Sequence, residues 1–241
     1  MDQNTDRFYR KWVSSDLVNF AVKDKETDIL VSAGKALQKE TESLIQKYRR
    51  DIINYIKKNQ NFEKSLEPLA FDEDAPDIIK AMLAAAKKTG VGPMAAVAGA
   101  VSEFVGRDLL NFTNEVILEN GGDIFIKTTR QRKIGIYAGA STLSGKIAII
   151  VKPESTPRGI CTSSGTVGHS LSFGKADAVC VTARDASLAD ACATAACNRV
   201  KNGHDIEKAL NFAKNIEGIA GAMVIYKDKL GTIGDIEMSK G

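Results

Sequence analysis

Asp190 and Thr194 stand four residues apart in an alanine-rich segment that runs from Ser187 to Cys197. Residues at this spacing share one face of a helix, so the pair offers two oxygen ligands one turn apart, which suits a hard cation such as Mg2+. Ser187 and Asp190 also have the spacing of a helix capping box, and the Thr194 hydroxyl could bond the carbonyl of Asp190 without a metal. Spacing alone favours the cap, and the metal site is the alternative.

A second candidate segment, Cys161 to Ser170, places a thiol, several hydroxyls and one of the two histidines close together in the chain. Hydroxyls and free amides on a glycine-punctuated loop suit a phosphate or the polar edge of a flavin, and an imidazole can exchange a proton near neutral pH. Ser and Thr bonding their own backbone is an equally simple interpretation, and the absence of a G-x-S-x-G motif disfavours a hydrolytic triad. The chemical interpretation makes His169 and Cys161 candidate catalytic residues, and Ser163, Ser164, Gly165 and Thr166 candidate ligand contacts.

Two glycine-rich turns could also hold a phosphorylated ligand. Gly90 to Ala95 matches the dinucleotide fingerprint G-x-G-x-x-A as a string, but a predicted helix precedes it instead of a strand, which excludes a Rossmann site. Pro93 at a helix start would leave the next two amides free for a phosphate, unless the segment is only a tight turn between helices. The second turn, Gly121-Gly122, permits close approach of a ligand or simply closes a hairpin. The candidate ligand contacts are Gly92, Met94, Ala95, Asn120, Gly121 and Gly122.

The four cysteines, Cys161, Cys180, Cys192 and Cys197, support a hypothesis of a different class. None form a C-x-x-C pair, so reduced thiols are expected, and their spacing suits zinc poorly. A thiolate at a loop has a depressed pKa and can carry a persulfide, which would make the protein a sulfur carrier or redox protein in sulfur assimilation, with Cys161 as the reactive thiol. Ordinary buried cysteine is the alternative, expected for at least two of the four.

Strands and helices alternate in blocks that must position these segments. The pattern predicts an α+β fold with mainly antiparallel sheets, in which two similar strand–helix pair–strand repeats share one core. We expect a single domain over residues 1–241, with the repeats at approximately 8–150 and 151–241. The predicted strands are Phe8–Val13, Leu17–Val22, Thr27–Ser32, Val116–Leu118, Ile124–Lys127, Lys133–Ala138, Lys146–Lys152, Ile160–Ser163, Ala178–Ala183, Met223–Lys227 and Thr232–Glu237; the predicted helices are Leu37–Ile56, Pro76 to Gly90, one after Pro93, Ser187–Val200 and Asp205–Asn215.

Composition excludes several classes of protein. With 44% hydrophobic and 26% charged residues among 241, the chain is neither disordered nor collagen-like. The 33 Lys and Arg nearly balance the 30 Asp and Glu, so no basic excess indicates a nucleic-acid partner. The longest apolar run, Met94 to Val101, is far shorter than the roughly 18 to 20 residues of a membrane span, and the polar start is unlike a signal peptide. A cytoplasmic location is expected.

Three ordered motifs resemble those of the ApbE superfamily, whose members move FMN from FAD to a protein threonine and use Mg2+. The motifs are VILENGGD at residues 116–123, CTSSG at 161–165 and ASLADACATA at 186–195. More closely, VGPMAAVAGA at 91–100 together with residues 159–170 resembles a smaller ApbE-like family of uncharacterised cytoplasmic proteins. This resemblance covers nearly the whole chain, from Tyr9 onward.

The resemblance implies a fold of two swapped α+β repeats, and FAD or FMN with Mg2+ as ligands. Asp190 and Thr194 fall on the superfamily's metal-binding helix, which raises the metal interpretation above the cap, although one residue can serve both. Residues 120–122 fall on its glycine-rich flavin loop, and residues 163–165 on its second loop.

The chain departs from the flavin transferases at two places. Ala98 precedes Gly99 where the transferases carry a lysine, and their loop with His-x-x-Asp-Pro is cut down here to residues 169–173. These departures favour a protein that binds a flavin or another phosphorylated nucleotide with Mg2+, and that acts as a transferase or hydrolase other than a standard FMN transferase. A protein acceptor, a homodimer, and a non-catalytic scaffold that meets its partner through the basic helix at 37–56 are left open.

Overall fold

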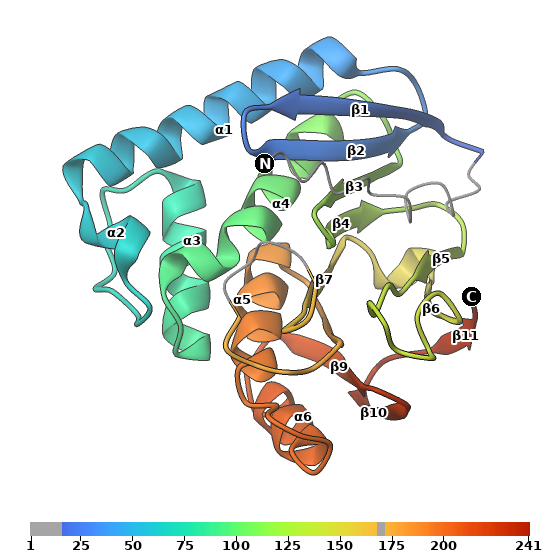
Figure 1. Cartoon of the computed structure of the whole chain (residues 1–241). Coiled ribbons are helices and arrows are strands. Elements are labelled where there is room, and N and C mark those ends of the chain that lie inside the picture. The colour runs from blue at the N-terminus through green and yellow to red at the C-terminus, as the bar shows by residue number, and fades with distance from the viewer. Residues whose placement is uncertain (1–15, 168–171) are drawn as a thin grey trace, which may run out of the picture.

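The computed structural model describes residues 16–167 and 172–241. Its elements form three layers: helices cover one face of an eight-stranded sheet, and a three-stranded sheet packs on the other face (Figure 1). Every strand pair in this part of the chain is antiparallel. The fold is therefore α+β with mainly antiparallel sheet, as predicted. The predicted strand Phe8–Val13 and the candidate catalytic residue His169 lie outside the described residues.

The large sheet has the strand order β1-β2-β3-β4-β7-β8-β9-β10. Five helical segments, of which one is a short 3-10 helix, separate β2 from β3 along the chain, and two separate β8 from β9. On each side of the β4–β7 contact, helices therefore stand between two pairs of strands. The strands of this sheet are β1 (Val18–Asp24), β2 (Thr27–Ala33), β3 (Val116–Asn120), β4 (Asp123–Lys127), β7 (Arg158–Ser163), β8 (Ala178–Ala183), β9 (Ile219–Tyr226) and β10 (Lys229–Gly234); the small sheet contains β5 (Arg132–Gly135), β6 (Ile147–Val151) and β11 (Met238–Lys240).

The helical layer is built around one nearly buried helix, α5. The helices α3, α4 and α6 pack against it, and the long helix α1 packs on α3 and α4. On α1 the buried residues Thr41, Ile45, Tyr48 and Ile52 recur every three or four residues. In α5 every residue except Thr194 is buried, and small side chains allow α4 and β7 to approach it closely. The helical segments are α1 (Gln38–Lys58), α2 (Asn61–Lys64), α3 (Asp77–Thr89), η2 (Pro93–Ala96), α4 (Val97–Leu109), η3 (Pro153–Ser155), α5 (Ala186–Cys197) and α6 (Ile206–Lys214).

Two glycines make the close packing of α5 possible. A Cβ on Gly159 of β7 would lie 2.3 Å from Ala186 Cα, and a Cβ on Gly99 of α4 would lie 2.3 Å from the Ala186 carbonyl oxygen. Both distances are far shorter than van der Waals contact. The first turn of α5 is therefore held between β7 and α4 at positions where only glycine fits.

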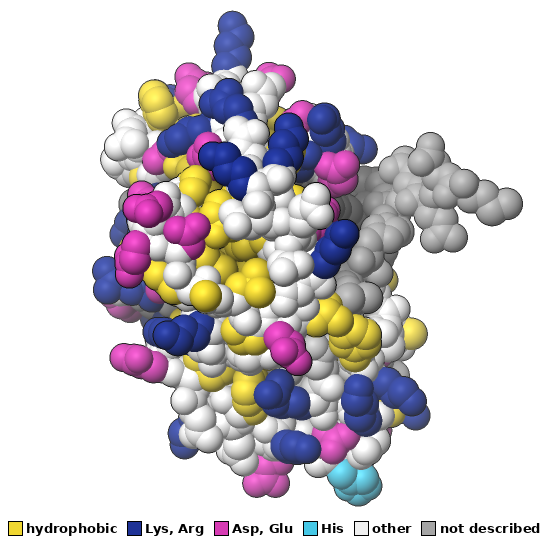
Figure 2. Space-filling model, turned by 90° about the vertical axis from the view of Figure 1, so that its left-hand side faces the viewer, with side chains coloured by type: hydrophobic (Ala, Val, Ile, Leu, Met, Phe, Trp, Pro, Cys, Tyr) yellow, Lys and Arg dark blue, Asp and Glu magenta, His cyan; other side chains and the backbone are white. Residues whose placement is uncertain are grey.

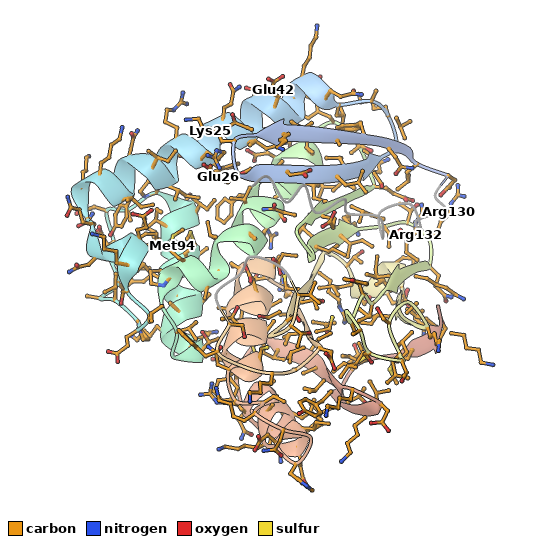
Figure 3. The ribbon with its side chains drawn as sticks, viewed as in Figure 1. Lys25, Glu26, Glu42, Met94, Arg130 and Arg132 are labelled. Atoms are coloured by element: carbon orange, nitrogen blue, oxygen red, sulfur yellow. The ribbon has the colours of Figure 1, made fainter. Side chains whose placement is uncertain are left out.

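Ion pairs join the elements at the periphery. Arg132 contacts Asp16 and Glu115, the latter at 2.7 Å, at the start of the small sheet (Figure 3). At the β1–β2 turn, Glu26 receives a 2.7 Å contact from Arg49, which ties this turn to α1. These contacts fix the outer strands and are remote from the segments with candidate chemistry.

The surface mixes charged and apolar side chains. On the face formed by α2 and α3, apolar side chains gather in the middle and both signs of charge surround them (Figure 2). Leu66 and Phe71, in the segment after α2, are 58% and 43% exposed. Among the helices of the described residues, none has the length and apolar character needed to span a membrane.

Candidate functional site

Asp190 lies on α5 with its carboxylate against the first turn of α4. Its Oδ2 accepts a hydrogen bond of 2.8 Å from the amide of Gly99, and the amide of Ala98 also bonds this carboxyl group. The residue at the α4 N-cap, Ala96, makes no cap bond by its own side chain. Asp190 therefore satisfies amides that a helix start leaves free, and its charge is favourable at the positive end of the helix dipole.

Glu103 of α4 makes the reciprocal contact with the first turn of α5. Its Oε2 accepts bonds from the amide and the hydroxyl of Ser187, at 3.1 and 3.2 Å, while Oε1 accepts a 2.8 Å bond from Arg107. The N-cap residue of α5, Asp185, makes no cap bond by its side chain. Each helix thus supplies the acidic cap of the other. The capping box predicted within Ser187–Asp190 is wrong, because both of its side chains bond α4.

The turn between β3 and β4 lies beside the same helix start. Gly121 and Gly122 have φ values of 70° and 104°, a region that favours glycine. Asn120 and Asp123 face each other across the turn, and the Asn120 side chain donates a 3.3 Å hydrogen bond to the carbonyl of Ala98. The hairpin and the ligand turn were alternative predictions; the hairpin is present, and it contacts the carbonyl of Ala98, the residue whose amide bonds Asp190.

Asp123 is a buried acid at this junction that the sequence analysis did not single out. Its Oδ1 atom is buried and has no hydrogen-bond partner among the described residues. Burial raises the pKa of Asp123 well above its usual range, and the charges of Asp190 and Glu119 raise it further. Burial also raises the pKa of Asp190, to about 7, although the two amides of α4 act in the opposite direction. Ionisation of either buried carboxyl group therefore disfavours ionisation of the other.

Cys161 reaches the same junction but not as a reactive thiol. It pairs with Asp123 across the β4–β7 ladder, and its Sγ donates a 3.3 Å hydrogen bond to the carbonyl of Ala186. Burial raises the pKa of Cys161 well above its usual range, and the charges of Asp123 and Asp190 raise it further. The expected low pKa at this thiol is therefore wrong, because the sulfur is enclosed beside acids instead of exposed beside a cation.

The other three cysteines are buried too. Burial raises the pKa of Cys180 and of Cys192 to about 12, and burial also raises the pKa of Cys197. Cys180 belongs to the second core, between the two sheets, while Cys192 and Cys197 lie inside the helical layer. None of the four has the exposure that thiolate chemistry requires.

Most hydroxyls of the segment after β7 are used within their own loop. Ser164 Oγ accepts the amide of Thr166 at 3.1 Å, and Thr166 Oγ1 donates a 3.1 Å bond to Asp177. A Cβ on Gly165 would lie 2.2 Å from the carbonyl of Gly174, so this glycine serves chain packing. Ser163 differs, because its buried Oγ has no hydrogen-bond partner in the described part of the chain. Gly122 lies next to this segment: a Cβ built on Gly122 would be 3.7 Å from the carbonyl oxygen of Thr162.

The Gly92-Pro93 turn before α4 packs directly against the backbone of Ser65. A Cβ on Gly92 would lie 1.8 Å from the carbonyl of Ser65, so this glycine is required by the backbone that crosses it. The amide of Ala95 donates a 3.1 Å hydrogen bond to the carbonyl of Gly92, so the expectation of a free amide there is wrong. Met94 is half-buried on the α3 side of the helical layer (Figure 3). The free helix start is one turn further on, at Ala98 and Gly99, where Asp190 occupies it.

The structure thus brings together the Asn120–Gly122 turn, Asp190 and Cys161, and adds Asp123. Thr194 is half-buried one turn after Asp190, on the only part of α5 that is not enclosed. Over residues 16–167 and 172–241, no three His, Cys, Asp or Glu side chains group as ligands for a metal ion. A cation at this junction would therefore need hydroxyl, carbonyl or ligand oxygens besides the carboxylates.

A sequence signal for Asp123 exists. Inward positions of a strand recur every two residues, and Phe125, two residues later, is fully buried in the helix-side core. A carboxylate at the first inward position of a strand, directly after Gly121-Gly122, is an unusual buried charge. Glu103, on an otherwise apolar face of α4, carries the same signal.

Comparison with known sequences shows close relatives among archaea. A UPF0280 protein of Methanocaldococcus jannaschii is 44% identical over 219 residues, which covers 88% of each chain. A UPF0280 protein of Methanothermobacter thermautotrophicus is 44% identical over 193 residues, covering 78% of this chain and 75% of the relative.

Solved structures share the fold at low sequence identity. The ApbE protein of Thermotoga maritima superposes with a TM-score of 0.62 at 14% identity, covering 90% of this chain and 96% of that one. The flavinyl transferase ApbE of Pseudomonas stutzeri gives a TM-score of 0.55 at 14% identity, covering 90% and 94%. The family model described as AbpE bacteria matches residues 10–238, which is nearly the whole sequence. The chain therefore belongs to the AbpE bacteria family and has the ApbE fold.

Proposed function

We propose that this protein binds a flavin or another phosphorylated nucleotide together with Mg2+ at the junction of α4, α5 and the β3–β4 turn. The observation that carries the proposal is the buried pair Asp123 and Asp190, in which the Oδ1 atom of Asp123 has no hydrogen-bond partner among the described residues. Two buried carboxyl groups are costly to ionise together, and a bound cation would stabilise their ionised form.

The donors at the junction are of the type that Mg2+ prefers. Carboxylate oxygens of Asp190 and Asp123 and the hydroxyl of Thr194 are hard ligands, and such sites are commonly completed by water and by phosphate oxygens of the substrate. Asp190, Thr194 and Asp123 would hold the ion. A cation bound there supplies positive charge that neutralises a diphosphate.

The surroundings can accept the rest of a nucleotide. The Gly121-Gly122 turn has no side chains that would block a ligand. Ser163 follows Cys161 by two residues on β7, and its buried Oγ meets no hydrogen-bond partner of normal geometry among the described residues. The flavin assignment rests on the fold shared with proteins described as flavin transferases. A shared fold does not establish a shared activity. We therefore propose a class of ligand for this protein and not the transfer reaction.

Group transfer to a protein is not part of the proposal. Ala98 stands where the flavin transferases carry a lysine, and its amide and carbonyl serve Asp190 and Asn120. What the residues of this chain do is bind and orient: the acids hold the cation, and the glycine turn admits the phosphates.

The proposal is tested by calorimetric titration with FAD, FMN and ATP, each with Mg2+ and with EDTA. We expect at least one nucleotide to bind with Mg2+ and to bind at least tenfold more weakly without it. Asp190→Asn should weaken Mg2+-dependent binding at least tenfold, because it removes one charge of the pair. Asp228→Asn, the same change at an exposed turn residue, is the matched control. Binding of none of the three, or equal binding by Asp190→Asn, would overturn the proposal.

A further inference from the structure

A polar hollow lies at the opposite end of β7 from Ser163. Its volume is about 430 Å3, and it is lined by the η3–β7 connection, by Arg184 after β8, and by the start of β9. Gly159 of β7 faces α5, so the preceding residue, Arg158, points to the other face of the sheet. The hollow is thus at the other end of β7 from the candidate site, and Arg158 points to the opposite face of the sheet.

Two arginines line this hollow. The β7–β8 ladder ends there with the pair Gly159 and Ala183; Arg158 precedes this pair on β7, and Arg184 directly follows β8 in a bend. Like charges at the same end of two paired strands repel each other, and an anion bound between them would relieve the repulsion.

The chain itself provides only partial compensation. Arg158, whose side chain is 11% exposed, makes one 2.9 Å ion pair with Asp235, which is itself 72% exposed. Arg184 is exposed, and no ion pair to it occurs in residues 16–167 or 172–241. One acid, Glu154, lines the hollow, while Lys127 approaches it from β4 with a 3.5 Å contact to Thr156 Oγ1. A positive excess therefore remains.

We propose that this hollow binds the phosphate or diphosphate group of a small anionic ligand, with Arg158 and Arg184 as the forked donors. A guanidinium presents five N–H donors in a planar fork that fits two phosphate oxygens at once. Arg158 has donors beyond the one used on Asp235, and Arg184 has all of its own.

The other polar groups in the hollow limit the chemistry that it selects. The hydroxyls of Ser155 and Thr156 each donate a 2.7 Å bond to a nearby carbonyl, so neither is a free donor for the ligand. Recognition therefore rests on charge and on the guanidinium forks. The volume exceeds that of a phosphate group and lies in the range of small-molecule sites, so the group belongs to a larger metabolite.

The test is calorimetric titration of the full chain with inorganic pyrophosphate in EDTA, so that no Mg2+-dependent site contributes. We expect the unmodified protein to bind pyrophosphate under these conditions, and the exposed variant Asp228→Asn to bind it equally. Arg184→Ala should weaken it at least tenfold, and Arg50→Ala, the same change at an exposed position of α1, should alter it less than twofold. Asp235→Asn should strengthen it severalfold, because it removes the carboxylate that competes for Arg158.

Two results would overturn the proposal. One is no heat of binding at millimolar pyrophosphate, and the other is an equal effect of Arg184→Ala and Arg50→Ala, which would indicate nonspecific attraction to net charge. Arg184 is exposed and outside the core, so Arg184→Ala is expected to fold, and a urea unfolding curve of the variant verifies this.

Discussion

At the scale of single residues, the chemistry of the junction depends on which polar groups are buried without partners. Asp123 Oδ1 and Ser163 Oγ are the two buried side-chain atoms without a hydrogen bond in the described residues, and both lie on strands that line the same side of the sheet. Buried polar atoms in folded proteins are nearly always bonded. Two exceptions on neighbouring strands are expected where a ligand or ordered water completes the bonding.

Asp123→Asn is predicted to stabilise the protein without ligand while it weakens ligand binding. The amide removes the repulsion with Asp190, so the free energy of unfolding at pH 8 in EDTA should rise by about 1 kcal/mol or more. Mg2+-dependent nucleotide binding should fall at least tenfold. Urea unfolding and calorimetry on the same preparation measure both effects. Loss of stability together with unchanged binding would contradict the role given to Asp123.

The four thiols are predicted to be inert in the native protein. Burial raises their pKa values, and the charges of Asp123 and Asp190 raise that of Cys161 further, so little thiolate is present at neutral pH. Alkylation with iodoacetamide, followed by mass spectrometry, should proceed at least about a hundredfold more slowly than in urea. If Cys161 is modified as fast as a peptide thiol under native conditions, the sulfur-carrier hypothesis regains its basis.

The sequence predicted those parts of the site that depend only on residue type and on spacing along the chain. The Asn120–Gly122 turn and the Asp190 helix were predicted, and the structure brings both to one junction. Spacing could not show that Asp190 bonds α4, because that contact joins residues 91 positions apart. The raised pKa of Cys161 could not be read from spacing for a related reason: burial raises it, and the neighbours Asp123 and Ala186 come from other elements.

At the scale of elements, the reciprocal caps make α4 and α5 one unit. Glu103→Ala is predicted to lower the free energy of unfolding by about 1–3 kcal/mol, since it leaves the buried Ser187 amide without its acceptor and leaves Arg107 only its contact with Asp185. Glu103→Gln keeps an acceptor oxygen and should cost less. Chemical denaturation of both variants measures the difference. Equal stability of Glu103→Ala and the unmodified protein would show that the caps are not needed.

The close approach of the two helices gives a second test. Gly99→Ala places a Cβ 2.3 Å from the carbonyl of Ala186 and 2.7 Å from Asp190 Cβ, so α4 and α5 must separate. We expect a loss of more than about 2 kcal/mol in the free energy of unfolding and weaker nucleotide binding. Gly135→Ala is the control, because nothing lies within 4 Å of its virtual Cβ. Similar stabilities of the two variants would contradict the packing described for α5.

Periodicity predicted most elements to within a few residues. The predicted helix Leu37–Ile56 corresponds to α1 at Gln38–Lys58, and the predicted strand Ala178–Ala183 to β8. The short helix α2 and the strand β11 were not predicted. They have 4 and 3 residues, which is too few for a helical or strand periodicity of apolar residues to be recognised. The division of strands between two sheets was also beyond the sequence, because β5 and β6 have the same alternation as strands of the large sheet.

At the scale of the whole molecule, stability, pH and Mg2+ are coupled through the buried acids. The pKa of Asp190 is about 7 in the folded protein against an ordinary value of 3.8, and burial shifts that of Asp123 in the same direction. The folded state therefore holds protons that the unfolded chain releases first. The resulting stability is fully present below about pH 4 and is lost as the pH rises through about 7.

A cation that binds the ionised pair should reverse this trend. Stabilisation by a ligand that binds only the folded state is about 2.7 kcal/mol at a concentration of 100 times its Kd. In EDTA we expect Tm to fall between about pH 5 and about pH 8, and we expect Mg2+ to raise Tm more at the higher pH, where the carboxyls are ionised. Asp190→Asn should flatten both responses, and the exposed variant Asp228→Asn should retain them. Thermal unfolding followed by circular dichroism measures all of these, and an Mg2+ effect that is the same at both pH values, or the same in Asp190→Asn, would place the cation elsewhere on the molecule.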